Sequence, residues 1–321
     1  MLKITGNYFL GIFLYTLVII LLADFGRILL KYVFHASWIH SRTAFTVAGA
    51  ICALLILLLS ACGIFHAKYI KTTSYDVIIN KTIPERTSMK VVLLADTHFG
   101  YNAGVLHARE LVRKINKQKP DLVCIAGDIF DNEYDAIRNP EKLEKTLRGI
   151  KSTYGVYACW GNHDLNEEIL AGFTFKHKDG DLSDIKDPRM KKFLEDSNIH
   201  ILEDESVLIN DQFYVIGRKD ASLTEKIHET RKAPAQLTEK LDRDKPIIMI
   251  DHQPKELQEL ADAGVDLDLC GHTHNGQTFP GNFTIKLMWE NPCGLLSKDN
   301  MTNITTVSYT HLRAHETRHD L

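Results

Sequence analysis

The sequence predicts an α/β domain preceded by two membrane-spanning helices, and three features of the chain support this prediction. Two long apolar runs lie before residue 71. Beyond them, short apolar runs of strand character alternate with helical segments, a pattern typical of a sheet buried on both faces. Five of these strands end in Asp, Asn or His residues, and open α/β sheets bind ligands at the carboxyl ends of their strands.

The composition limits the classes of protein to consider. With 321 residues, the chain has room for one domain of about 200 residues and additional segments. The formal net charge is -3, so no excess of basic residues points to a nucleic-acid partner. The six cysteines form no CxxC pair, and three of them lie in apolar strand-like runs. We therefore expect buried free thiols rather than a disulfide framework.

The two N-terminal apolar runs extend from Tyr8 to Leu22 and from Ala44 to Phe65. At about 1.5 Å per residue, the second is long enough to cross a hydrocarbon core of about 30 Å. The first is at the short end for a span and is followed by Asp24, Arg27 and Lys31, which suit an interfacial stop. We expect both runs to cross a membrane.

Other structures for these runs agree less well with the sequence. No small-residue cleavage site follows the first run, as a signal peptide requires. Neither run has the polar face of a helix in a soluble domain, although the first could still form a re-entrant segment. Lysine and arginine are equally frequent on both sides of the runs, so the positive-inside rule does not orient them. Residues 1–71 are therefore predicted to form a multi-pass membrane anchor whose orientation stays open.

Beyond residue 71, the elements of the α/β domain follow in order. The predicted strands are Tyr75–Ile79, Lys90–Ala95, Asp121–Ala126, Val156–Trp160, Pro246–Ile250 and Leu267–Cys270. The predicted helices are Arg109–Gln118, Glu141–Ile150, Arg189–Asp196 and Lys255–Ala263. The runs Ile199–Leu208 and Gln212–Ile216 predict a hairpin that turns at Asn210-Asp211. The polar stretch Lys176–Asp187 is expected to be a loop over the site.

Polar clusters follow five of the predicted strands. In chain order they are Asp96-Thr97-His98, Gly127-Asp128, Gly161-Asn162-His163-Asp164, Asp251-His252 and Gly271-His272-Thr273-His274. Any one of them is common in loops, but the full set in this order is specific. Alternation along an extended chain places Asp96 and His98 on one side, and the same holds for His272 and His274. We therefore expect these residues to converge on one site.

The residue types in these clusters favour a divalent-metal centre. Glycine before Asp128, Asn162 and His272 lets the backbone turn sharply beside a metal ion. The carboxylate of Asp128 has two oxygens and can bridge two cations, whereas the amide oxygen of Asn162 adds a ligand without charge. Oxygen and imidazole donors without thiolate suit Mn, Fe, Zn or Ni rather than Ca or an iron–sulfur cluster.

These motifs resemble those of the calcineurin-like metallophosphoesterases, in particular their membrane-attached bacterial branch. The likeness rests on DTH at 96–98, GD at 127–128, GNHD at 161–164, His252 and GHTH at 271–274, and it covers about Lys90 to Val307. It implies a four-layer sandwich of two mixed β-sheets flanked by helices, here as a domain over residues 72–307. It also implies a bacterial cell membrane as the location.

The resemblance implies a role for each residue of the clusters. One metal ion is expected at Asp96, His98 and His274, a second at Asn162, His252 and His272, and a bridging role is expected for Asp128. His163 is expected to contact the phosphate and to donate a proton to the leaving oxygen, with Asp164 orienting its ring. The alternative for this pair is a structural role. Arg218 and Asp220 could line the pocket or belong to the loop surface.

The activity that the resemblance implies is hydrolysis of a phosphodiester, phosphomonoester or pyrophosphate bond by a dimetal centre. A membrane anchor favours a lipid-linked substrate such as UDP-diacylglucosamine. If Tyr75–Ile79 pairs with the domain as a strand, only a few residues after Ala67 are left as a tether, and the domain stays near lipid head groups. The alternative is a non-catalytic metal-binding membrane scaffold. Loss of ligands would indicate a scaffold, and the sequence retains all of them.

The C-terminal segment 308–321 does not look native. It contains His315-Glu316-Thr317-Arg318-His319, the HExxH pattern of zinc proteases. That pattern needs a buried helix and a third ligand downstream, but here the flanks are polar and only two residues follow. The resemblance leads us to expect a Gly-rich segment and a closing strand after Val307, so the tail is excluded from the fold prediction.

Overall fold

The computed structural model describes residues 2–66, 69–84, 87–167, 169–170, 173–174, 186–276 and 281–306. The chain forms two compact units, which divide mainly between Tyr69 and Ile70. The first unit is helical, and the second is an α/β unit that carries the polar clusters.

The first unit consists of two long helices. Helix α1 covers Leu2–Tyr32 and helix α2 covers Arg42–His66, with a short 3-10 helix, η1 (Ser37–His40), between them. Both are long and apolar enough to cross a membrane, over Tyr8–Tyr32 and Arg42–Phe65. Large apolar side chains are exposed along both helices, and water disfavours a surface of this kind. The structure therefore supports membrane association, and the first apolar helix is longer than the predicted run.

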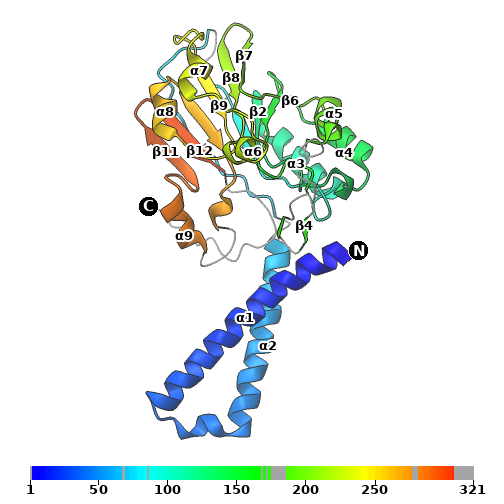
Figure 1. Ribbon diagram of the computed structural model, residues 1–321, viewed down its shortest axis with the longest axis vertical. Helices are drawn as coiled ribbons and strands as arrows, with labels where there is room; N and C mark the ends of the chain where they lie inside the picture. Colours follow the sequence, from blue (N-terminus) through cyan, green and yellow to red (C-terminus); the bar gives the residue numbers. More distant parts are fainter. Residues whose placement is uncertain are drawn as a thin grey trace. The chain divides into compact units, whose positions relative to one another are not determined.

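Two β-sheets form the centre of the second unit (Figure 1). The four-stranded sheet has the order β1 (Val91–Leu94), β2 (Leu122–Ala126), β3 (Val156–Cys159) and β6 (His200–Ile201). The six-stranded sheet has the order β11 (Gly294–Lys298), β12 (Met301–Thr305), β10 (Leu267–Cys270), β9 (Ile247–Ile250), β8 (Phe213–Gly217) and β7 (Glu205–Ile209). Two short strands, β4 (Ile169–Leu170) and β5 (Phe173–Thr174), pair separately.

The two sheets differ in strand direction. In the six-stranded sheet, β11 and β7 run antiparallel to their neighbours and the other pairings are parallel. This sheet is mixed, as expected. In the four-stranded sheet, the described pairings are all parallel.

The sheets pack face to face, and helices cover their outer faces. In β2, Leu122 and Cys124 contribute to the core between the sheets, whereas Val123 and Ile125 contribute to a core with the helices. The covering helices are α3 (Val105–Gln118), α4 (Pro140–Leu147) and α5 (Pro188–Asp196) on one sheet, and α7 (Pro234–Thr238) and α8 (Leu257–Asp262) on the other. The expected four layers are therefore present.

Helix α3 shows how the sequence forms an outer layer. Its buried residues Ala108, Leu111, Val112 and Ile115 follow the i, i+3, i+4, i+7 spacing that places side chains on one helical face. The remaining face carries charged residues and ranges from half-buried to exposed. The helix ends at Lys119, which has a left-handed conformation with φ of 52°.

The five strands that precede the polar clusters form within one residue of the predicted limits. Two other predictions differ from the structure. Tyr75–Ile79 is not a strand, and its Val77 and Ile79 side chains instead pack against the core between the sheets. The run Ile199–Leu208 divides, because β6 pairs with β3 and β7 pairs with β8. The turn between β7 and β8 lies at Asn210 and Asp211, as predicted, and both residues have positive φ.

Several elements were not predicted. Among them are the β11–β12 hairpin, α7, η2 (Tyr134–Ala136), α6 (Ala221–Lys226), η3 (His274–Gly276) and α9 (Gly281–Met288). In β12 the buried residues are Met301, Asn303 and Thr305, so burial alternates but hydrophobicity does not. The predicted loop at 176–187 lies mostly outside the described residues, and so do segment 308–321 and the strand expected after Val307.

Candidate metal centre

The strands bring the five polar clusters to one place. Three clusters follow β1, β2 and β3 of the four-stranded sheet, and two follow β9 and β10 of the six-stranded sheet. Because parallel strands end at the same edge of a sheet, each set of side chains lies at a carboxyl edge. The predicted ligands Asp96, His98, Asp128, Asn162, His252, His272 and His274 are within reach of one another through the contacts below.

The side chains form two groups that could each hold a cation. In one, ligand atoms of Asp96, His98 and His274 all lie within 4.8 Å of one another, and the three residues are buried. In the other, ligand atoms of Asp128, His252 and His272 also lie within 4.8 Å of one another, with Asp128 and His252 buried and His272 half-buried. Asn162 adjoins the second group, because its Oδ1 lies 3.0 Å from Nε2 of His252.

Asp128 lies between the two groups. Its Oδ2 is 3.2 Å from Nε2 of His252 in the second group and 3.8 Å from Nε2 of His98 in the first. Its other oxygen, Oδ1, accepts a hydrogen bond from the backbone N–H of His163 at 2.7 Å. A carboxylate in this position can face both groups at once, as a bridging ligand must.

The backbone at these residues adopts an uncommon conformation. Positive φ angles occur at Asp96, His98, Asp128, His272 and His274, where a side chain costs conformational energy. Backbone hydrogen bonds hold two of the turns, from Asp96 N–H to Gly127 O and from His98 N–H to Asp128 O, each at 3.0 Å. Such strained turns cluster at functional sites because they aim side chains that a regular strand would separate.

Two glycines are required by close approach within the site. A Cβ on Gly161 would lie 2.2 Å from Oδ1 of Asp128. A Cβ on Gly127 would lie 2.6 Å from Nδ1 of His252, and φ of Gly127 is +75°. Any larger residue would therefore displace a candidate ligand.

The electrostatics of the histidines suit cation binding. Burial lowers the pKa of His98 well below its usual range, and burial together with the charge of His252 lowers the pKa of His272 to about 3. Both rings are therefore neutral near pH 7 and keep a lone pair for a metal ion. The Nδ1 atom of His98 is buried without a hydrogen-bond partner among the described residues, and a bound cation would satisfy such an atom.

The pKa values of the two candidate carboxylate ligands, Asp96 and Asp128, are shifted in opposite directions. Burial raises the pKa of Asp96 well above its usual range. Burial also acts to raise the pKa of Asp128, but the charges of His252 and His163 outweigh it and hold this pKa well below the usual range. Buried charges of this kind need compensation, and oxygen and imidazole donors together fit the divalent ions expected from the sequence.

The ring of His163 is oriented by a residue that was not predicted. Its Nδ1 lies 2.5 Å from Oδ1 of Asn132, and the backbone N–H of Asn132 donates to the carbonyl of His163 at 3.1 Å. The expectation that Asp164 orients this ring is wrong. Asp164 instead accepts backbone hydrogen bonds from Phe130 N–H at 2.8 Å and Gly161 N–H at 2.7 Å. The Asp164 carboxylate thus stabilises the backbone turn, whereas the Asn132 side chain orients the His163 ring.

Two more residues of the site, Asp131 and Trp289, were missed. Asp131 forms a third group with His98 and His163, with ligand atoms within 4.8 Å of one another. Asp131 and Asn132 follow Asp128 closely in the chain, so their place in the same turn was the available signal. Trp289 lies edge-on to the ring of His272, with centroids 5.2 Å apart, and no motif marks it.

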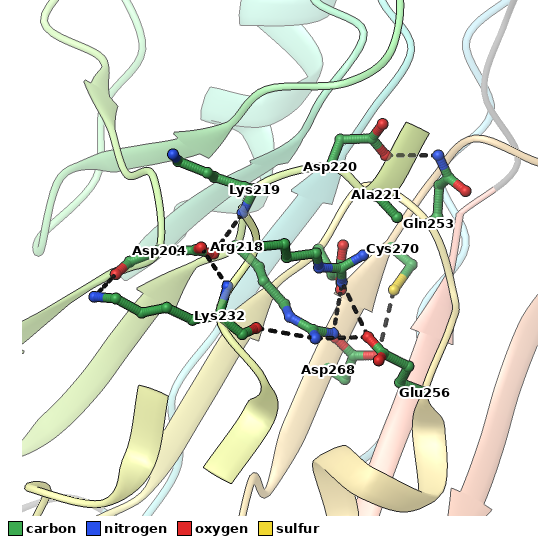
Figure 2. A network of polar contacts seen from close by, with 12 residues as sticks. Asp204, Arg218, Lys219, Asp220, Ala221, Lys232, Gln253, Glu256, Asp268 and Cys270 are labelled. Carbon is green, nitrogen blue, oxygen red and sulfur yellow. Dashed lines mark hydrogen bonds and ion pairs between the residues drawn. The ribbon is translucent and has the colours of Figure 1, made fainter. Parts of the chain in front are cut away.

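Arg218 belongs to a buried ionic network behind the site (Figure 2). Its side chain is 1% exposed, which rules out the loop surface that the sequence left open. The guanidinium donates to Asp251 at 3.2 Å and to Glu256 at 2.6 Å. Arg231 also pairs with Asp251. Because Asp251 immediately precedes His252, two arginines fix the backbone that carries this candidate ligand.

Asp220 fixes the residue on the other side of His252. It is fully buried, so it is not on the loop surface either. One of its oxygens accepts from the backbone N–H of Leu223 at 2.8 Å, and the other accepts from Nε2 of Gln253 at 2.7 Å (Figure 2). His252 is therefore held on both sides, and its own Nδ1 lies 2.8 Å from the carbonyl of Ala126.

A comparison with protein families identifies the family of the chain. The family model described as calcineurin-like phosphoesterase matches residues 89–276, which is more than half of the chain and includes all five polar clusters. The chain belongs to the calcineurin-like phosphoesterase family. The resemblance seen in the sequence motifs is therefore confirmed, and so is the fold class that it implied.

Relatives from several organisms carry related names. An uncharacterized metallophosphoesterase of Helicobacter pylori is 28% identical over 222 residues, covering 67% of this chain and 52% of that protein. A transmembrane protein with metallophosphoesterase domain from Bos taurus is 27% identical over 252 residues, covering 74% and 52%. The UDP-2,3-diacylglucosamine pyrophosphatase LpxG of Chlamydia trachomatis is 22% identical over 233 residues, covering 62% and 68%. The chain spans about half the length of the first two relatives.

Proposed function

We propose that the chain is a membrane-attached hydrolase of phosphate esters or anhydrides that works with two divalent metal ions. The observation that carries this proposal is the position of Asp128 between the two cation groups, 3.2 Å from His252 and 3.8 Å from His98. Asp96, His98 and His274 would hold one ion, Asn162, His252 and His272 the other, and Asp128 both. Mn, Fe, Zn and Ni fit this set of oxygen and imidazole donors.

When bound, two such ions supply positive charge that lowers the pKa of a water molecule and neutralises phosphoryl oxygens. The residues of the chain contribute binding, orientation and proton transfer. Asn132 Oδ1 accepts a hydrogen bond from Nδ1 of His163, which leaves Nε2 as the ring atom that faces substrate. A proton on this atom can pass to the leaving oxygen. Asp164 does not transfer the proton, because its oxygens hold the backbone of Phe130 and Gly161.

The test is phosphate-ester hydrolysis by the purified full-length protein in detergent. Substrates are p-nitrophenyl phosphate, its phosphodiester analogue and a soluble nucleotide pyrophosphate, each assayed after chelation and after reloading with Mn, Fe, Zn or Ni. We expect one class to be hydrolysed only by the reloaded protein. A protein that binds metal but hydrolyses none of them would support the alternative, a non-catalytic membrane scaffold.

For the natural substrate, we propose a lipid-borne phosphodiester or pyrophosphate, such as UDP-diacylglucosamine. Two observations support this choice: the two apolar helices α1 and α2, and the similarity to a Chlamydia trachomatis protein named UDP-2,3-diacylglucosamine pyrophosphatase. A tethered active site meets membrane lipids at high local concentration, whereas a soluble metabolite gains nothing from the tether. In mixed micelles, hydrolysis should therefore follow the surface fraction of the lipid substrate. Dependence on bulk concentration alone would contradict the proposal.

We also propose that α1 and α2 both span the membrane, so that the protein is multi-pass, with the catalytic domain at 72–307. This rests on the length and apolar character of Tyr8–Tyr32 and Arg42–Phe65. In vesicles, the loop that contains Ser37–His40 and the catalytic domain should lie on opposite sides if each helix crosses once. Labelling of cysteines placed at Ser37 and at Asp211 with an impermeant reagent measures this. If the reagent, added outside the vesicles, labels both cysteines, the two positions lie on the same side of the membrane and α2 does not span it.

A further inference from the structure

Helix α9 (Gly281–Met288) presents large apolar side chains to the outside of the α/β unit. None of its residues is buried. Leu287 is 89% exposed, Met288 75% and Phe283 61%. Phe283 and Leu287 are four residues apart and therefore lie on the same helical face. Single exposed apolar residues are common on proteins, but three on one short helix indicate a surface that contacts an apolar environment.

Both ends of α9 are fixed to segments of the candidate metal centre. At its start, the backbone of Gly281 approaches Gly276 so closely that a Cβ on Gly276 would lie 2.3 Å from the Gly281 carbonyl carbon; Gly276 ends η3, which begins at His274. Just past its end, Trp289 packs edge-on against His272 at 5.2 Å. The apolar face of α9 therefore lies at the rim of the site.

The chemistry around this apolar face matches the interface of a lipid bilayer. Lys286 is exposed on the helix itself, and Nζ of Lys255 lies 5.4 Å from the ring centroid of Trp289. Aliphatic side chains, a tryptophan and lysines together are the composition of helices that lie at membrane surfaces. Helices α1 and α2 bring the protein to a bilayer, because they are apolar, long enough to span it and exposed along their lengths.

We propose that α9 lies in the interfacial region of the bilayer that holds α1 and α2, with Phe283, Leu287 and Met288 turned toward the acyl chains. Trp289 then links this contact directly to His272. The consequence is that the rim of the metal centre is held at the level of the lipid head groups. This inference rests on the membrane attachment under the proposed function, and not on a lipid being the substrate.

Photo-cross-linking of the full-length protein tests the contact. Benzoylphenylalanine is incorporated in place of Leu287 and, as the matched control, in place of Leu106, which is 79% exposed on α3. The proteins are reconstituted in vesicles of phosphatidylethanolamine and phosphatidylglycerol, irradiated and digested for mass spectrometry. A phospholipid adduct at 287 and none at 106 supports the proposal. A cross-link from 287 to a second copy of the chain, or no lipid adduct there, overturns it.

Kinetics on two substrates then tests the consequence for the site. Leu287→Ser should lower kcat/KM on a lipid-borne pyrophosphate by roughly tenfold, since burial of one leucine corresponds to about that factor. Hydrolysis of p-nitrophenyl phosphate should stay unchanged, and Leu106→Ser should affect neither. An equal loss on both substrates would overturn the proposal in favour of a folding effect. If wild type hydrolyses only p-nitrophenyl phosphate, the lipid substrate is excluded and the cross-link alone decides on α9; if it hydrolyses neither substrate, the proposed function fails as well, and the cross-link still decides on α9.

Discussion

The Asp128 carboxylate lies near histidines of both candidate cation groups, 3.2 Å from His252 and 3.8 Å from His98, and is nearly fully buried. An amide at this position would keep the size but remove the charge and much of the ability to bridge. For Asp128→Asn we expect metal content to fall below two ions and turnover to drop by at least about 10²-fold. Elemental analysis and phosphate release measure the two effects.

The matched control for this variant is Asp211→Asn. Asp211 lies in the β7–β8 turn, far from the polar clusters in the chain, and its carboxylate is 82% exposed. The amide tolerates the positive φ of this turn, so metal content and turnover should equal those of wild type. Two bound ions and normal turnover in Asp128→Asn would contradict the bridging assignment.

His163 is predicted to act on the substrate without holding a metal ion. Its ring is half-buried, and Nδ1 is engaged by Asn132. His163→Ala should therefore retain both ions and lose about 10²–10⁴-fold in rate, as for loss of a general acid. His163 also lies near His98 and Asp131, within ligand distance of a shared cation. Loss of one ion from His163→Ala would therefore reassign His163 as a metal ligand.

Asn132 is predicted to act through the ring of His163. Asn132→Ala removes the acceptor for Nδ1, so we expect roughly a tenfold loss of kcat with unchanged metal content. Asn132→Asp keeps an acceptor and adds a negative charge that favours the protonated ring. Its activity should therefore persist to higher pH than that of wild type, as measured by kcat against pH. An unaltered pH profile in Asn132→Asp would argue against contact with the proton donor.

At the scale of elements, the end of β9 depends on buried ion pairs. Arg218 and Arg231 share the carboxylate of Asp251, and Arg218 also pairs with Glu256. Removing one partner of a buried pair costs about 3–5 kcal/mol when the other charge loses all compensation. Arg231 still pairs with Asp251 when Arg218 is replaced, so Arg218→Met should cost less than this and lower the midpoint of thermal unfolding by roughly 5 °C.

The control for Arg218→Met is a surface pair of the same chemistry. Arg113 pairs with Glu110 at 2.6 Å on α3, with its side chain 63% exposed. Exposed pairs contribute about 0–1 kcal/mol, so Arg113→Met should leave the midpoint nearly unchanged. Equal shifts for both variants would show that the buried network does not stabilise the end of β9.

For the whole α/β unit, the candidate metal centre joins the two sheets. Three clusters come from the four-stranded sheet and two from the six-stranded sheet, so bound ions would hold both carboxyl edges together. Because ligands that bind only the folded state stabilise it, chelation should lower the unfolding midpoint and added Mn should restore it. Asp128→Asn should show a smaller response to the chelator. An identical midpoint with and without chelator would contradict this role.

The sequence alone determined the residues of the site and the strands that carry them. Continuous apolar runs such as Asp121–Ala126 form buried strands because such runs must be covered on both faces. Parallel strands end at one edge, so Asp96 and Asp128 converge at the edge of one sheet and His252 and His272 at the edge of the other, whereas the packing of the sheets decides how the two edges meet. These are local patterns joined by a single topological rule, and both can be read without coordinates.

Only the tertiary structure decided the contacts between segments distant in the chain. Val77 and Ile79 show the alternation of a strand, but their side chains pack on the core between the sheets without joining either sheet in the described structure. The acceptor for His163 proved to be Asn132 rather than its neighbour Asp164, because Asp164 is used by the backbone of Phe130 and Gly161. The sequence left open whether Arg218 lines the pocket or belongs to the loop surface, and the structure buries it in ion pairs with Asp251 and Glu256. In each case the same local pattern permits several partners, and long-range packing selects one.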